Sequence, residues 1–513
     1  MQKQDLNIVF KDYSPNQLML LPPSLEELIP ANHPSRTVNS VIERIDLSSV
    51  TRLYSQNGAS SYHPRMLLKV LVYGYLENCF SSRKLEKAIC ENIVFMWLAG
   101  MQHPDHHTIN RFRSERLKEV IGDIFSQIVL LLHEEGLLDI REIYTDGTKI
   151  EANANRYTFV WGKAIKNNRE RISKQLKELW EYAGSVAAQE LGSSEEQDFV
   201  NPSPEQVART VDKINQALEG KPVDKKVKQK LNYAKKNWPA KLEEYAQKEA
   251  ILGERNSYSK TDPEATFMRM KEDHMKNGQL KPAYNLQLST HGQFVVNYSL
   301  HPNPTDTLTL KPHLERYYQL FGFYPSTCTA DAGYGSEENY CFMEENHIEA
   351  FVKYNLFHNE LQQESKPKKV HGLLDNLHYD PEQDRYICPM GQPMEPKGES
   401  IRKTSTGFVQ SYLHYRAKNC TGCPLATACK PGSGNKVLKV NTRLNELKAK
   451  TKERLTSELG IQKRKKRATD VEPVFGHFKY NKGRGRFMLR GKKKVEIETG
   501  LLAIAHNLAK MAG

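Results

Sequence analysis

Apolar residues recur at helical spacing along the first quarter of the chain, from residue 35 to about residue 135. Stretches such as 64–78 and 107–136 carry them every three or four positions, and short polar breaks separate the stretches. The pattern predicts a helical N-terminal region. The segment 105–116 follows a polar break and carries Arg111 and Arg113, which suits the second helix of a DNA-binding helix-turn-helix. An ordinary charged helix face accounts for the two arginines equally well.

A second helical pattern begins near Lys163 and ends near Glu254. Apolar positions again recur every three or four residues, but Lys and Glu fill most of the positions between them. This composition is typical of helices that pack against one another with large exposed faces. We therefore expect two or three long helices that form an inserted coiled hairpin.

The hydrophobic period changes to two in the middle of the chain, which predicts strands. One strand is expected to end on Asp146, and two more are joined by the hairpin signal His291-Gly292. A helix capped by Thr305 or Asp306 follows, and then strand, helix and strand up to about residue 355. This order predicts a mixed sheet with helices packed against it, an α/β (α+β) fold.

The 513 residues exceed what one ordinary core requires, so several domains are expected. The periodicities divide the chain into a helical N-terminal domain, a strand-containing domain assembled from three segments, a helical insert and a Cys-containing insert. Their expected bounds are, in that order, residues 1–135; residues 136–162, 256–355 and 464–513; residues 163–255; and residues 356–463.

Positive charge is concentrated near the C-terminus. Residues 430–494 hold 21 Lys and Arg against 5 Asp and Glu, a balance of +16, whereas the whole chain has a net charge of +13. A local field of this size favours a polyanion, and nucleic acid is the usual one. A solvated basic tail is the alternative, but ordered-looking elements such as 471–480 interrupt the segment.

Membrane insertion and secretion are not indicated. Apolar runs such as 128–132 are far shorter than the roughly 20 residues that span a bilayer. Residues 1–16 lack the charged and then apolar pattern of a signal peptide. We expect a cytoplasmic, nucleoid-associated protein with no membrane partner.

Two strand-like segments end on an aspartate, which is followed by glycine in 145-TDGT-148 and by a small residue and then glycine in 330-ADAGYG-335. In the predicted sheet these strands are neighbours, which would place Asp146 and Asp331 side by side. Two carboxylates this close repel each other unless a cation lies between them. Mg²⁺ is the natural occupant, because it prefers one or two carboxylates together with phosphate oxygens and water.

Glu472 is the candidate for a third acid, which a site for two metal ions requires. Pro473 suits the first turn of a helix, so a helix is expected to begin near Thr469. Lys479 would follow two turns later on the same face and bind phosphate. Further cations that could contact DNA are Lys149, Arg467, Arg484, Arg486 and Arg490.

These residues resemble the bacterial insertion-sequence transposases of the DDE type. The resemblance rests on the helical N-terminal region and on the motifs YTDGTKIEANAN, TADAGYG and VEPVFGHFKYNKG. It implies an RNase H-like catalytic fold with Asp146, Asp331 and Glu472 as the acidic triad and Lys479 as the lysine that follows the glutamate. Related groups carry an arginine four residues before the glutamate; here that position is Ala468, and Arg467 lies one residue earlier.

The resemblance further implies cleavage of element ends and strand transfer into target DNA, with two Mg²⁺ (or Mn²⁺) ions as cofactors. The expected partners are double-stranded DNA, as terminal repeats and as target, and a second copy of the chain in a homodimer. A metal-dependent nuclease without strand transfer would share the triad. A DNA-binding regulator with an unused catalytic centre is the third alternative, and the presence of all three acids argues against it.

Four of the eight cysteines fall in one segment, with the spacing Cys-x31-Cys-x2-Cys-x5-Cys. Sparse cysteines with one Cys-x2-Cys pair suit tetrahedral Zn²⁺ better than a disulfide framework. We expect a structural zinc site in a small ribbon-like insert; four free thiols are the alternative. The residues are Cys388, Cys420, Cys423 and Cys429.

Overall fold

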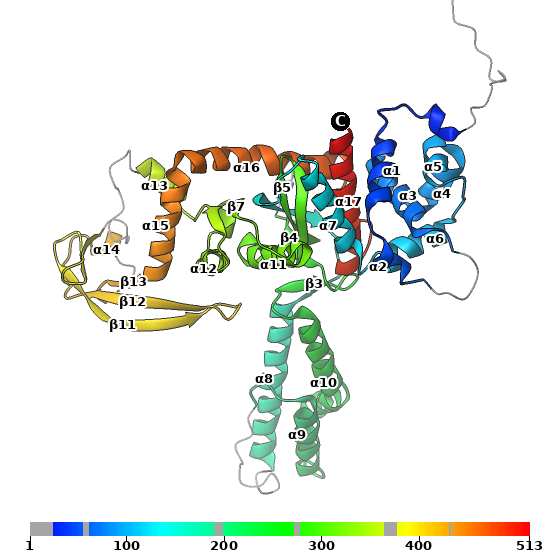
Figure 1. Ribbon diagram of the computed structural model, residues 1–513. Helices are drawn as coiled ribbons and strands as arrows, with labels where there is room; N and C mark the ends of the chain where they lie inside the picture. The colour runs from blue at the N-terminus through cyan, green and yellow to red at the C-terminus, as the bar shows by residue number, and fades with distance from the viewer. Residues whose placement is uncertain are drawn as a thin grey trace, which may run out of the picture. The chain divides into compact units, whose positions relative to one another are not determined.

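The computed structural model describes residues 24–54, 61–187, 189, 199–270, 278–363, 377–429, 432 and 434–513 (Figure 1). The chain divides into two compact units, the first comprising Met1–Val120 with Ala505–Gly513 and the second comprising Ile121–Ile504. The segment 1–16, in which no signal pattern was found, lies outside the described residues.

The described part of the first unit is helical, as its hydrophobic pattern predicts. Two of its helices begin at a His-Pro pair. His33 and His63 accept a backbone N–H at the cap, and the proline that follows each fills the first helical position. Its elements are the 3₁₀ helix η1 (Leu25–Leu28), α1 (Pro34–Arg44), α2 (Ser48–Thr51), α3 (Pro64–Leu76), α4 (Ser82–Glu91), α5 (Ile93–Leu98), α6 (His106–Arg111) and the π turn η2 (Phe112–Arg116).

The second unit is built on a mixed six-stranded sheet. Its order is β4-β5-β1-β7-β8, and β6 pairs with β5. β1 is antiparallel to β5 and parallel to β7, and β7 is parallel to β8. The predicted succession of three strands, helix, strand, helix and strand is present, but the sheet also contains β4, which was not predicted. The strands are β1 (Glu142–Glu151), β4 (Thr266–Arg269), β5 (Leu280–His291), β6 (Phe294–His301), β7 (Thr327–Ala330) and β8 (Glu349–Val352).

The turn between β5 and β6 is the predicted hairpin, with Gly292 and Gln293 both at positive φ. Of the two predicted caps, Thr305 is the N-cap of only a 3₁₀ turn, whereas α11 itself begins at Leu310 and has Thr309 at its N-cap. The helices around the sheet are α7 (Ile121–Glu134), η3 (Asp306–Leu308), α11 (Leu310–Phe321), η4 (Ala332–Tyr334), α12 (Glu337–Glu345), α16 (Glu458–Gly476), the π turn η6 (His477–Asn481) and α17 (Lys492–Ala512).

Helices α11 and α16 pack on opposite faces of the sheet. Alternate residues of β1 point to opposite faces, so some of its side chains meet α11 and the others meet α16. Thr145 bonds to Ser289, which in turn bonds to His313 of α11. The side chains of Glu142 and Asp146, on the other face of β1, point toward α16. There Lys463 pairs with Glu142 at 2.8 Å. Lys463 and Arg467 are one helical turn apart, and they meet Glu142 and Asp146, which are four residues apart on the strand.

A buried polar cluster joins α11 to β5 and β6. His313 contacts the hydroxyls of Ser289 and Ser299 at 2.8 and 2.6 Å, and its burial lowers its pKa far below the ordinary value. His301 lies next to Ser299 and is also buried. Burial, and then the cations Lys492 and Arg316, lower the pKa of His301 to about 4. Both imidazoles are therefore neutral in the folded protein.

The stability of this unit is expected to fall as the pH drops from 6.5 to about 4. In the unfolded chain the two histidines take up protons below pH 6.5, whereas the folded chain cannot do so without breaking the cluster. The stabilisation is therefore complete above pH 6.5. The melting temperature measured between pH 7.5 and pH 5 should show this fall, and His301→Asn should reduce its slope. An unchanged melting temperature over that range would contradict the assignment.

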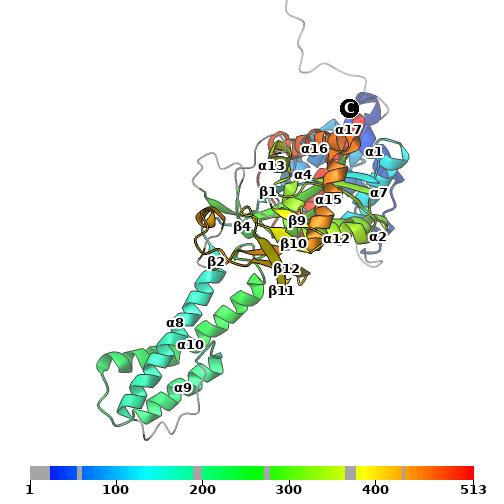
Figure 2. The ribbon, with the colours of Figure 1, turned by 90° about the vertical axis from the view of Figure 1, so that its left-hand side faces the viewer.

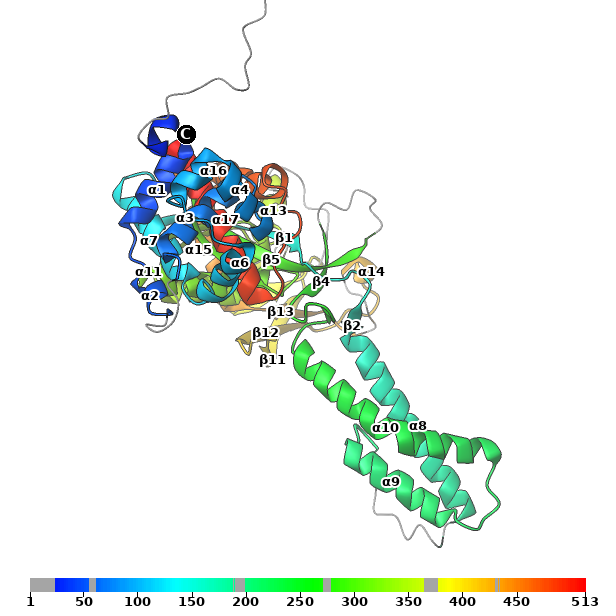
Figure 3. The same cartoon turned by 90° about the vertical axis from the view of Figure 1, so that its right-hand side faces the viewer.

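Three long helices form the predicted insert between β2 and β3, which pair with each other at its base. Two views show the helices side by side (Figure 2; Figure 3). They enclose a small apolar core of their own, which includes Leu176, Val211 and Trp238. The elements are β2 (Phe159–Trp161), α8 (Gly162–Val186), α9 (Pro204–Ala217), α10 (Lys225–Leu252) and β3 (Ser257–Ser259).

The cysteine-containing segment folds as an antiparallel sheet in the order β13-β12-β11-β10-β9. Its buried core is small and consists of Met394, Tyr415, Ala417, Leu438 and Val440. Its elements are α13 (Phe357–Gln363), β9 (His378–Asp380), β10 (Arg385–Ile387), β11 (Pro393–Lys403), β12 (Val409–Ala417), α14 (Ala426–Cys429), β13 (Val437–Val440) and α15 (Thr442–Thr456).

No helix within the described residues combines the length and the apolar character that crossing a membrane requires.

Candidate active site

The parallel pairing of β1 and β7 brings Asp146 and Asp331 to matching positions. Tyr144 pairs with Thr329, and each aspartate lies two residues beyond its member of that pair. The expected adjacency of these two strands is confirmed. β7 ends just before Asp331, whose Oδ1 accepts the N–H of Gly333 at 2.7 Å. The expectation that β1 ends on Asp146 is wrong, because β1 continues to Glu151 through its pairing with β5.

Arg467 connects Asp146 with Glu472. One guanidinium nitrogen lies 2.8 Å from Asp146 Oδ2, and another lies 3.9 Å from Glu472 Oε1. The side chains of Arg467 and Asp146 are 11% and 14% exposed, whereas that of Glu472 is 61% exposed. Arg467 therefore lies between the two acids, although it stands one residue before the position that carries the arginine in related groups. Its Nε is buried and has no hydrogen-bond partner among the described residues.

Helix α16 does not begin near Thr469, as the proline suggested, but at Glu458. Pro473 therefore lies inside the helix, where proline leaves the carbonyl four residues earlier without its helical partner. That carbonyl belongs to Thr469, and the Gln293 side chain donates to it at 3.1 Å. This contact to the β5–β6 turn satisfies the carbonyl that the proline frees.

Asp470 fastens the same helix to the same turn. Its carboxylate accepts the hydroxyl of Thr290 at 2.5 Å and the backbone N–H groups of Gly292 and Gln293 at 2.9 and 3.1 Å. The side chain is buried, so these three bonds form away from water. Asp470 thus sets the position of Glu472, which follows two residues later.

Asp306 is a fourth carboxylate near the two aspartates, and its residue pattern indicates only a possible helix cap. Asn285 and Gln287 donate amide hydrogens to its Oδ1 at 2.8 and 3.0 Å. A Cβ added to Gly333 would lie 3.1 Å from Asp331 Oδ1 and 3.6 Å from Asp306 Oδ2. Asp306 therefore borders the site beside Asp331.

Lys353 is a cation at this site that the sequence also did not indicate. It directly follows β8, whose last residue pairs with the last residue of β7, immediately before Asp331. Burial and then the guanidinium of Arg467 lower the pKa of Lys353, while Asp331 and Asp146 act in the opposite direction. To predict that Lys353 lies at this site, one would have to know that the chain turns directly after β8.

Lys479 does not continue the helical face of Glu472. The chain leaves the α-helix at Gly476 and forms the π turn η6, so the seven-residue spacing no longer corresponds to two α-helical turns. Lys479 is partly buried in this turn.

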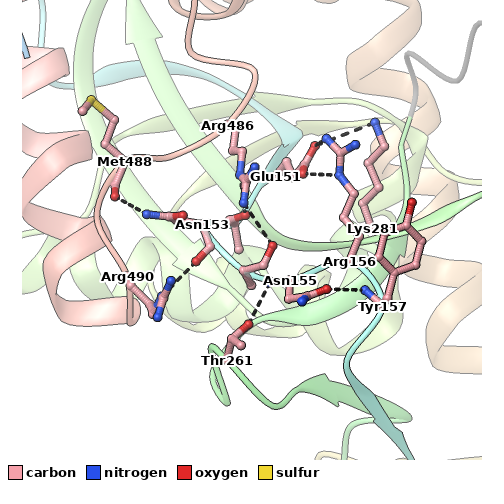
Figure 4. A network of polar contacts seen from close by, with 12 residues as sticks. Glu151, Asn153, Asn155, Arg156, Tyr157, Thr261, Lys281, Arg486, Met488 and Arg490 are labelled. Carbon is pink, nitrogen blue, oxygen red and sulfur yellow. Dashed lines mark hydrogen bonds and ion pairs between the residues drawn. The ribbon is translucent and has the colours of Figure 1, made fainter.

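The basic segment after η6 packs against the loop that follows β1 (Figure 4). Arg486 donates to the carbonyls of Ala152 and Ala154 at 3.2 and 3.0 Å, and Arg490 donates to that of Asn153 at 3.0 Å. Both arginines remain largely exposed. They hold the loop in place and still present charge to solvent.

Arg484 differs from these two arginines, because it is buried 3.5 Å from the carboxylate of Glu498, itself 1% exposed. The interpretation of Arg484 as a DNA contact therefore does not fit its surroundings. Lys149 is partly buried and donates to the Arg269 carbonyl at 3.1 Å.

The two arginines singled out in the first unit also differ. Arg111 is 68% exposed and forms an ion pair with Glu115 one turn later. Arg113 is buried and donates to the Phe80 carbonyl at 2.6 Å and to Asn110 at 3.2 Å. Because Arg113 is enclosed by its own unit, it supports the fold and is not available to DNA.

Two family models match the chain. One is described as a transposase DDE domain and matches residues 387–512, a range that includes Glu472. The other is described as a transposase domain (DUF772) and matches residues 23–115. The chain belongs to the insertion-sequence DDE transposases. Comparisons of this transposase with curated proteins and with solved structures gave no match.

DDE transposases use divalent metal ions, and the carboxylates of this transposase suit such an ion by their chemistry. Asp146 and Asp331 offer two oxygen donors from adjacent strands, and Glu472 offers a third on a long exposed side chain. Among the described residues, no three acid, histidine or cysteine side chains are arranged to hold one ion. A shared ion would therefore require Glu472 to turn past Arg467 toward the aspartates.

Proposed function

We propose that this transposase cuts the ends of its element and joins them to target DNA by metal-dependent phosphoryl transfer. Asp146, Asp331 and Glu472 are the proposed ligands of two Mg²⁺ (or Mn²⁺) ions. The observation that carries the proposal is the β1–β7 register, which brings two aspartates far apart in sequence to matching positions. The strand order β6-β5-β1-β7-β8, with β5 antiparallel to β1, supports an RNase H-like assignment for this sheet.

The bound ions would supply an activated water or hydroxyl nucleophile and stabilise charge on the leaving oxygen. The chain's own residues would orient and neutralise the reacting groups. Arg467, nearly buried between Asp146 and Glu472, is proposed to hold both carboxylates in position. Lys353 and Lys479 would offset the charge of the DNA phosphates.

The proposed DNA contacts lie on exposed cations. Arg486, Arg490 and Arg111 meet that condition, whereas Arg113 and Arg484 do not. Their partners would be the double-stranded terminal repeats and the target DNA, in the cytoplasm at the nucleoid. Because two element ends must be held together, we infer that the active form is a homodimer.

Purified full-length protein with labelled DNA carrying the sequences that flank its own gene tests this function. With Mg²⁺, cleavage at a defined end and joined products are expected, and EDTA should abolish both. Glu472→Gln should also abolish both, while the matched change Glu458→Gln, on an exposed position of the same helix, should have no effect.

The alternatives give different products. Cleavage without any joined product would indicate a nuclease, and binding without cleavage in Mg²⁺ or Mn²⁺ would indicate a regulator. Cleavage that survives Glu472→Gln would contradict the proposed triad.

A further inference from the structure

Four cysteines from three separate stretches line one small cavity in the antiparallel sheet segment. Cys388 follows β10, Cys420 and Cys423 follow β12, and Cys429 ends α14. The cavity has a volume of about 30 Å³, and all four cysteines are free and partly buried. The other side chains around it are mainly apolar, among them Pro389, Met390, Leu425 and Ala426.

Backbone N–H groups point at two of these sulfurs. The N–H of Gln392 donates to Cys388 Sγ, and that of Lys436 donates to Cys420 Sγ, both at 3.3 Å. An N–H donor suits a sulfur that carries negative charge when it binds a metal. Such outer contacts are typical of metal-ligating residues.

The chain turns sharply beside both of these sulfurs, with a left-handed glycine in each turn. Gly391 has φ +77° and Gly422 has φ +70°. A side chain other than glycine is rarely tolerated in that conformation. In the Cys388 turn, the N–H of Gly391 also donates to the Cys388 carbonyl at 2.9 Å. The turns thus hold each cysteine at the edge of the cavity with its backbone folded around the sulfur.

We propose that Cys388, Cys420, Cys423 and Cys429 bind one Zn²⁺ ion as a structural site. Four thiolates and an apolar surrounding suit tetrahedral zinc with no open position for a substrate. The described sulfurs are not close enough to share an ion as they stand, so binding would draw the turns inward and release the thiol protons. Lys436, which donates to the Cys429 carbonyl at 2.7 Å, would lie beside the negative centre.

The surrounding sheet has a reason to need such a site. Among its described residues, the buried core comprises five hydrophobic side chains, with Cys388 and Cys420 packed against them. A core this small stabilises a fold weakly, and a structural metal is a common remedy. The ion would link the loop after β10, the loop after β12 and α14 across one end of the sheet.

The same sheet supports the segment that follows Asp331. Glu337, at the start of α12, is 4% exposed and accepts hydrogen bonds from Gln410 of β12 at 2.9 Å and from Asn441 at 2.6 Å. Thr406 donates to the neighbouring Glu338 at 2.6 Å. Under the proposed function, loss of the ion would therefore also loosen the support of the second aspartate.

Metal analysis of the purified full-length protein tests the site without reference to DNA. We expect one zinc per chain, lost in Cys423→Ser and retained in Cys90→Ser, which changes an exposed cysteine of α4. The proposal would be overturned if the unchanged protein, even after zinc is added, held no more zinc than the Cys423→Ser variant. Equal loss in both variants would also overturn it.

If the Cys423→Ser variant does not fold, two measurements on the unchanged chain still test the site. Co²⁺ in place of zinc should give the visible absorption of a tetrahedral thiolate site. A chelator should make four additional cysteines reactive toward a thiol reagent and should open residues 388–429 to protease. Absence of the cobalt spectrum, or a disulfide among the four cysteines, would refute the zinc site. Either result would leave the proposed phosphoryl transfer standing, because none of these measurements depends on cleavage.

Discussion

Replacing Asp331 by Asn is expected to abolish DNA cleavage while the chain stays folded. The amide oxygen of Asn can still accept the N–H of Gly333, so the turn after β7 should persist. The negative charge that would bind the metal is lost. Changes in residues that merely support metal ligands cost about 10–100-fold, so loss of a ligand should exceed about a hundredfold. The rate of end cleavage at fixed Mg²⁺ measures the effect.

The matched control is Asp212→Asn, the same chemical change in the helical insert, where Asp212 pairs with Lys235 at the surface. It should cleave at the unchanged rate. DNA binding by both variants should remain, since neither residue is a proposed DNA contact. An Asp331→Asn protein that cleaves as fast as the control would show that TADAGYG is not part of the active site.

Replacing Asp470 by Ala is expected to destabilise the second unit strongly. The substitution leaves the Thr290 hydroxyl and two backbone N–H groups without their acceptor at a buried position. Hydrogen bonds to a charged group contribute about 1.5–3 kcal/mol each but are not additive, so about 3 kcal/mol is expected in total. For a cooperative unit as long as Ile121–Ile504, the melting temperature should fall by roughly 4 °C.

Asp470→Asn keeps one carbonyl oxygen as an acceptor and should cost roughly half as much in melting temperature. Glu458→Ala, at an exposed position of the same helix, should leave it unchanged. Cleavage by Asp470→Ala should be lost even at temperatures where the protein is folded, because Glu472 depends on this attachment. An Asp470→Ala protein with the melting temperature of the unchanged protein would show that the contact with the β5–β6 turn does not stabilise the position of α16.

The neighbouring positions of Asp146 and Asp331 could be predicted from sequence because strand order and a short motif after each strand are local signals. The same signals predicted the β5–β6 hairpin at His291-Gly292. Asp306 and Lys353 could not be found in this way. Their proximity to the site depends on how two loops fold against the sheet, and no pattern of residue types records that.

The start of α16 differs from the predicted one for a physical reason. Proline is favoured in the first turn of a helix, so Pro473 suggested a start near Thr469. In the structure the carbonyl that proline leaves free is satisfied by Gln293, a contact between residues 176 positions apart in sequence. Likewise, Arg113 and Arg484 resemble surface cations in sequence, and only packing shows that they are buried.

The position of α16 late in the chain has a consequence for synthesis on the ribosome. All six strands of the central sheet are complete at Val352, but the helix that covers the Asp146 face of β1 ends at Gly476. At about 5–20 residues per second, the ribosome needs on the order of ten seconds to make the intervening segment. During that time the face of β1 that carries Glu142, Tyr144 and Asp146 would stay uncovered, so the nascent transposase should acquire its active site only as its final helices emerge.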